Sequence, residues 1–89
     1  MSMADRFRLR IYSPERELVD TDVAEVTAPG AFGEIGVLPD HAGLVTTLEA
    51  GTLTYKEGAK TSRLKITGGF AEVRDNVMTV LADAAEALG

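Results

Sequence analysis

Short segments of alternating apolar and polar residues, separated by turn residues, cover most of the chain and limit its fold more than any other feature. Residues 7–12 read FRLRIY, which puts Phe7, Leu9 and Ile11 on one face and Arg8, Arg10 and Tyr12 on the other. A period of two is typical of a half-buried β-strand. The same alternation returns along the chain at hairpin spacing. The sequence therefore predicts an all-β protein.

The last of these segments differs from the others. Residues 77–82 are apolar on both faces, as expected for a central strand or for a strand with one face against a partner. No helical period occurs before Asp83, so the pattern predicts an antiparallel sandwich or small barrel of about eight to ten strands. Strands are expected at residues 7–12, 17–19, 23–28, within 31–43, and at 44–49, 52–57, 62–67, 70–74 and 77–82.

The C-terminal residues change character. Residues 84–88, AAEAL, are strong helix formers, and Asp83 before them is a suitable cap. So few residues cannot hold a helix alone. We expect one β domain over residues 1–83, followed at 84–89 by at most a helical stub.

Composition excludes several classes of function. The chain has 89 residues, no cysteine and a formal net charge of −5. Disulfides and thiolate metal sites are thereby excluded, and an acidic balance argues against nucleic acid as a partner. No apolar stretch approaches the length of a membrane span, and charges at residues 5–10 argue against a signal peptide, so we expect the chain to stay in the compartment where it is made.

His41 is the only histidine, and Asp40 and Glu34 lie near it in sequence. This trio is one hypothesis for a metal-dependent hydrolase. A catalytic zinc usually takes three protein ligands, and two carboxylates with one histidine match that metal poorly. We favour a loop histidine that makes contacts, and we expect no catalytic residue, metal or cofactor.

Phe32 lies in a glycine-rich loop, AFGEIG. A phenylalanine at a loop tip fits either docking to a partner or packing inward. The corresponding alternative function is that of a small protein-binding adaptor.

Beyond these patterns, three stretches carry a family resemblance. They are FRLRIYSPERELV (residues 7–19), AEVTAPGAFGEIGVLPDHAGLVTTLEAGTL (24–53) and GGFAEVRDNVMTVLAD (68–83). In combination they resemble the epsilon subunits of rotary proton-driven ATP synthases over nearly the whole chain. The resemblance implies a ten-stranded sandwich in the central stalk, between the gamma subunit and the ring of c subunits. It also implies a non-catalytic rotor part, peripheral to the cytoplasmic face of a bacterial inner membrane and associated with that membrane only through the complex.

The resemblance assigns roles to particular residues. Glu34 matches the family position that faces the polar loops of the c ring, and Phe32 and Gly33 flank it. Ser13 and His41 match positions on the side turned toward gamma.

The chain departs from the family pattern in two ways. The family usually has glycine at the position of Asp40 and proline at that of Gly43, and aspartate tolerates a positive φ at residue 40 less well than glycine does. Family members also commonly continue into a two-helix arm that inhibits ATP hydrolysis, and some bind ATP on it. The sequence given stops where that arm begins, so we expect this chain to lack the arm's inhibition and nucleotide site.

Overall fold

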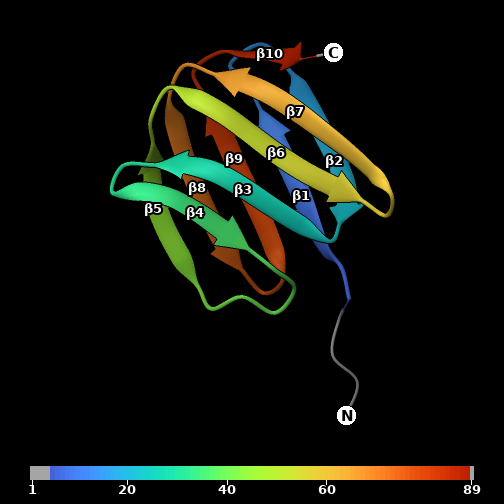
Figure 1. Ribbon diagram of the computed structural model, residues 1–89. Coiled ribbons are helices and arrows are strands. Elements are labelled where there is room, and N and C mark those ends of the chain that lie inside the picture. Colours follow the sequence, from blue (N-terminus) through green and yellow to red (C-terminus); the bar gives the residue numbers. More distant parts are fainter. Residues whose placement is uncertain (1–4, 89) are drawn as a thin grey trace.

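The computed structural model describes residues 5–88, which contain ten strands and no helix (Figure 1). The expected all-β class is confirmed. No helix in this range is long and apolar enough to cross a membrane. The strands are β1 (Phe7–Tyr12), β2 (Glu17–Val23), β3 (Glu25–Gly30), β4 (Gly33–Val37), β5 (Leu44–Leu48), β6 (Gly51–Glu57), β7 (Lys60–Ile66), β8 (Gly69–Arg74), β9 (Val77–Ala82) and β10 (Ala85–Leu88).

These strands form one curled sheet in the order β10-β7-β6-β3-β5-β8-β9-β1-β2, with β4 paired to β3 outside this path. The sheet folds over at β3, which pairs with β4 and β6 but meets β5 at the single pair Gly30 and Leu48. The result is a sandwich. In Figure 1 the front layer contains β4, β3, β6, β7 and β10, and the back layer contains β5, β8, β9, β1 and β2.

The space between the layers is filled by apolar side chains from alternate strand positions. In β1, Phe7, Leu9 and Ile11 are buried, whereas Arg8 and Arg10 point outward. Among residues 5–88 no polar or charged residue is buried, so apolar packing fills the space between the layers. At its margin the Thr21 hydroxyl of β2 donates to Glu57 Oε2 of β6 at 2.8 Å. The core comprises Phe7, Leu9, Ile11, Val23, Val26, Ala28, Val37, Leu48, Leu53, Leu64, Ile66, Ala71, Val73, Met78, Val80 and Ala82.

The prediction of a wholly antiparallel sheet is wrong at one pair of strands. β1 and β9 run parallel, from Arg8 opposite Val77 to Tyr12 opposite Leu81. The two strands come from opposite ends of the chain, so no hairpin fixes their relative direction. Alternation of apolar residues is the same in either direction, which is why the sequence pattern did not reveal it.

The C-terminal residues, expected to form at most a helical stub, form a strand and no helix. Residues 85–88 form β10, which pairs antiparallel with β7 from Ala85 opposite Ile66 to Leu88 opposite Arg63. Ala85 packs against the core. Helix propensity is a weak preference, and a segment this short gains more from an available sheet edge than from a single helical turn.

Two strand boundaries differ from expectation as well. β2 continues to Val23 because its acidic residues pair with β1, Asp20 opposite Arg10 and Asp22 opposite Arg8. Pro29 and Gly30, expected to end a strand, belong to β3. The chain reverses at Ala31 and Phe32, between Gly30 and Gly33, which face each other in the β3–β4 hairpin.

Candidate interaction surfaces

The β3–β4 hairpin brings Phe32, Gly33 and Glu34 together at its tip. Phe32 is 101% exposed, so the hypothesis that its ring packs inward is wrong and the hypothesis that it projects from the loop tip is correct. Gly33 has φ 123°, a value that favours glycine. Glu34 lies in β4 opposite Pro29 and is exposed on the outside of the front layer. The three residues predicted to contact the c ring thus form one projecting element.

His41 lies in the exposed loop between β4 and β5, away from that hairpin tip. Asp40 has φ 63°, so the position where the family has glycine does need a left-handed backbone, and aspartate adopts it here. The His41 N–H donates to Leu38 O at 3.2 Å, and its Nδ1 lies 2.6 Å from Ala42 O. The Asp40 N–H donates to Asn76 Oδ1 at 2.8 Å, which joins the loop to the β8–β9 turn.

Ser13 lies at the opposite end of β1 from Asn76, in the turn that leads to β2. Its N–H donates to Arg16 O at 2.9 Å, and the Arg16 N–H donates to Ser13 O at 3.3 Å. Ser13 also lines a shallow groove with Tyr12 and Leu81. The two residues predicted to contact gamma are therefore not neighbours: each lies at one end of the back layer.

Between those two ends lies an apolar surface that the sequence analysis did not identify. Val45 in β5, Phe70 in β8 and Leu81 in β9 are 62%, 39% and 50% exposed. Phe70 and Leu81 are directly opposite each other in the β8–β9 pair. In the β5–β8 pair, Val45 is opposite Glu72 and Thr47 is opposite Phe70. Val45 therefore lies diagonally across from Phe70. We call these three residues the apolar face. The sequence hinted at this surface in one place, at residues 77–82, which are apolar on both faces of the strand. That strand, β9, lies at the centre of the back layer.

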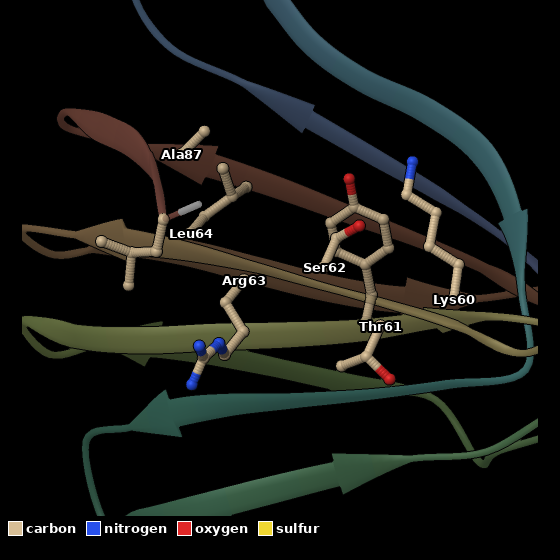
Figure 2. A pocket seen from close by; sticks show the side chains of 8 residues that line it. Lys60, Thr61, Ser62, Arg63, Leu64 and Ala87 are labelled. Atoms are coloured by element: carbon tan, nitrogen blue, oxygen red, sulfur yellow. The ribbon is translucent and has the colours of Figure 1, made fainter.

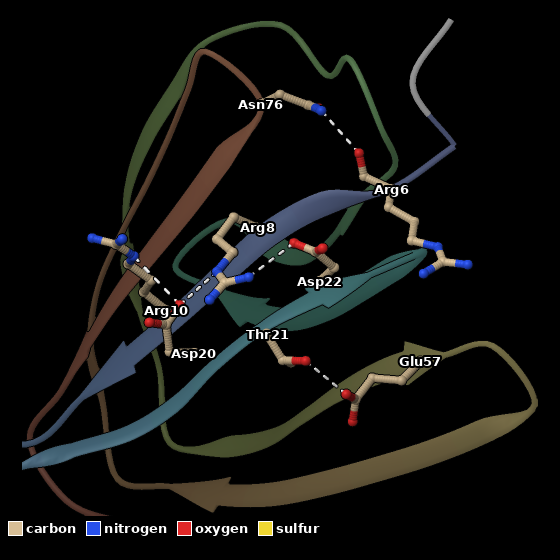
Figure 3. Close-up of polar contacts among 8 residues, drawn as sticks. All are labelled: Arg6, Arg8, Arg10, Asp20, Thr21, Asp22, Glu57 and Asn76. Atoms are coloured by element: carbon tan, nitrogen blue, oxygen red, sulfur yellow. Dashed lines mark hydrogen bonds and ion pairs between the residues drawn. The ribbon is translucent and has the colours of Figure 1, made fainter.

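The arginines of β1 are paired within the back layer (Figure 3). Arg8 Nε lies 2.6 Å from Asp20 Oδ1, and Arg8 Nη1 lies 3.2 Å from Asp22 Oδ1, while Arg10 Nε lies 3.5 Å from Asp20. Hydrogen bonds to Asp20 and Asp22 raise the pKa of Arg8, and the hydrogen bond from Arg8 lowers the pKa of Asp20. Because β2 pairs beside β1, the carboxylates of Asp20 and Asp22 lie next to Arg8 and Arg10 and neutralise their charge.

A second groove runs along the open edge of the front layer, at β7 and β10 (Figure 2). Its volume is 610 Å³. Lys60, Arg63, Leu64 and Ala87 are among its lining residues, and Figure 2 shows Leu64 beside Ala87 at one end and Lys60 at the other. The described lining residues include no carboxylate or histidine, so the groove contains no acid-base pair.

The metal hypothesis finds no support in the described residues. Glu34 lies near the start of β4, whereas Asp40 and His41 lie beyond its end. Over residues 5–88 no three His, Asp or Glu side chains are grouped so that they hold a metal ion.

Comparison with known proteins identifies the family. The delta/epsilon-chain β-sandwich domain of ATP synthase matches residues 6–88. An ATP synthase epsilon chain of Pelotomaculum thermopropionicum is 51% identical over 79 residues, which are 89% of this chain and 59% of that protein. An epsilon chain of Carboxydothermus hydrogenoformans is 48% identical over 84 residues, 94% of this chain and 63% of that one. The chain thus spans less than two thirds of these relatives' length.

Solved structures agree. A chain in the electron cryo-microscopy structure of the Euglena gracilis mitochondrial ATP synthase, containing OSCP, F1 and c-ring, superposes with a TM-score of 0.89 at 30% identity, covering 98% of this chain and 56% of that one. A central stalk and c-ring structure from Tetrahymena thermophila has a TM-score of 0.79 at 15% identity, covering 96% of this chain and 69% of that one, and shows a shared fold alone. Together with the family match over residues 6–88, these likenesses establish that the chain belongs to the delta/epsilon family of ATP synthase subunits and comprises its β-sandwich domain.

Proposed function

We propose that this chain is a rotor part of a rotary ATP synthase, which binds gamma through the back layer and the c-subunit ring through the β3–β4 hairpin. The family membership supports the assignment to the synthase. The single observation that carries the proposed gamma contact is the apolar face, because exposed apolar patches on small soluble domains mark interaction sites.

The apolar face supplies the energy that this contact needs. Complete burial of a leucine or valine side chain is worth about 1.5–3 kcal/mol. Leu81 is 50% exposed, so docking gains roughly half of that, about 1 kcal/mol, and Val45 and Phe70 add similar amounts. Ser13 borders this surface next to Leu81, and the His41 loop borders the same layer at its other end.

The proposed c-ring contact is of a different kind. Phe32 offers a fully exposed ring at the hairpin tip, and Glu34 offers an exposed carboxylate beside it. A solvent-exposed charge pair is worth only about 0.2–1 kcal/mol. Glu34 therefore sets the register of the contact with the c ring, while the greater part of the affinity comes from gamma.

The proposed task is mechanical. Ion flow turns the c ring, and this domain, bound to both ring and gamma, carries the rotation to gamma inside the catalytic head. A close-packed sandwich with an entirely apolar core resists deformation, which torque transfer requires. In this proposal the domain makes and breaks no bond and uses no cofactor. As part of the complex it is peripheral to the membrane, at the cytoplasmic face of a bacterial inner membrane.

The test is titration of purified gamma with the chain and two variants. Leu81→Ala removes part of the apolar face and is expected to weaken binding about fivefold, from a loss of about 1 kcal/mol. Lys65→Ala is the control, because Lys65 is exposed on β7 in the front layer, away from both the apolar face and the His41 loop. Equal affinity for the wild type and Leu81→Ala, or no binding of gamma at all, contradicts the proposal. In the latter case a general adaptor function becomes the better hypothesis.

A further inference from the structure

Asn76 makes more connections than a turn residue needs. It lies with Asp75 in the β8–β9 turn, where the two residues have φ 62° and 52°. Its side-chain oxygen accepts from the Asp40 N–H at 2.8 Å. Its side-chain nitrogen donates to Arg6 O at 2.9 Å, as Figure 3 shows. Its main-chain oxygen accepts from the Arg8 N–H at 3.1 Å. Three segments far apart in sequence therefore meet at one amide.

This amide ties down the loop that carries His41. The hydrogen bonds described for His41 itself stay within the loop, to Leu38 O and Ala42 O. The bond from the neighbouring Asp40 N–H to Asn76 instead reaches the back layer. Asp40 adopts φ 63°, a conformation that costs energy for a non-glycine residue. The bond to Asn76 compensates for this cost and fixes the direction in which the chain enters His41.

We infer that Asn76 is a positioning residue for the gamma interface: it holds the His41 loop beside the apolar face before gamma arrives. This inference rests on the proposed function. A loop that is already ordered does not lose conformational freedom on binding, so affinity is higher than for a mobile loop. An asparagine suits this place because its amide both accepts and donates, and because asparagine tolerates a left-handed backbone.

The test uses matched glycine substitutions in the full 89-residue chain. Asn76→Gly keeps the left-handed backbone and removes the amide. Asp75→Gly is the control at the neighbouring position, where the carboxylate makes only a distant ion pair with Arg74 at 3.9 Å. A third variant, Asn76→Asp, keeps an acceptor for the Asp40 N–H but loses the donor to Arg6.

Two readouts are needed: hydrogen exchange of the Asp40 amide in the free chain, and affinity for purified gamma. Asn76→Gly is expected to speed Asp40 exchange at least tenfold and to weaken gamma binding about three- to tenfold. Asp75→Gly is expected to leave both close to wild type. Asn76→Asp keeps the acceptor for the Asp40 N–H but sets a carboxylate oxygen against Arg6 O, so its effect on both readouts is expected to lie between wild type and Asn76→Gly. Unchanged exchange in Asn76→Gly, or faster exchange with unchanged affinity, overturns the inference. If wild type fails to bind gamma, the proposed function falls and this inference with it, which the wild-type titration alone reveals.

Discussion

Replacing Gly69 by alanine tests the packing of the back layer most severely. Gly69 has φ +150°, and a Cβ added there would lie 2.2 Å from Leu81 O and 3.0 Å from Ala82 Cα. Both neighbours are backbone atoms of β9, so no side chain can move aside. Residues held at such a φ cost about 1–3 kcal/mol. Moving the backbone also weakens the pairing of Gly69 with Ala82 and Leu48, at about 1 kcal/mol for each hydrogen bond disturbed.

The expected loss is therefore about 3–5 kcal/mol, a large part of a total stability on the order of 4–13 kcal/mol for a domain of this size. The assay is urea unfolding followed by circular dichroism, with a thermal scan, in which the midpoint should fall by at least about 12 °C. Gly36→Ala is the control, since a Cβ there meets nothing within 4 Å and its φ is not left-handed. If Gly69→Ala unfolds within about 1 kcal/mol of wild type, the argument from backbone contact is refuted.

Three further predictions concern core, loops and charge. Leu53→Ala, at a fully buried position, should lower the free energy of unfolding by about 2–5 kcal/mol in urea, and a loss under 1 kcal/mol would contradict the core assignment. Glu34→Ala and His41→Ala should leave that free energy within about 0.5 kcal/mol, because both residues are exposed, and a large loss would contradict their placement. The hydrogen bond from Arg8 lowers the pKa of Asp20 in the folded protein. This ion pair therefore stabilises the fold fully above the ordinary carboxyl pKa, and its contribution is lost as the pH falls through the lower pKa of the folded state. Asp20→Asn should flatten that part of an acid-unfolding curve, and an unchanged curve would speak against the pairing.

Most strands were predictable because their signal is local. The alternation at residues 7–12 and the apolar run at residues 77–82 mark β1 and β9 to the residue. Asp75 and Asn76, which separate the strands expected at 70–74 and 77–82, both have a positive φ, as a tight turn requires. What failed depends on contacts between distant segments: β10 became a strand only because the edge of β7 was available, and the parallel direction of β1 and β9 is set by the way the whole sheet closes.

The candidate sites likewise differ in whether their residues are close together in the sequence or come from distant segments. Phe32, Gly33 and Glu34 are adjacent in sequence, so their gathering at one hairpin tip could be predicted. The apolar face could not, because Val45 lies on β5, which pairs with β8, and these two strands are not consecutive in the sequence. The bridging role of Asn76 escaped notice for the same reason, since its partners Asp40 and Arg6 are 36 and 70 residues away.

Photocrosslinking from opposite sides of the sandwich tests the central claim most directly. A photoreactive amino acid is placed at Leu81 on the back layer, or at Lys65, which is exposed on β7 in the front layer, and the chain is assembled with gamma and the c ring. The account predicts a crosslink to gamma from position 81 and none from position 65. A crosslink to gamma from position 65 without one from position 81 would show that the apolar face is not the docking surface.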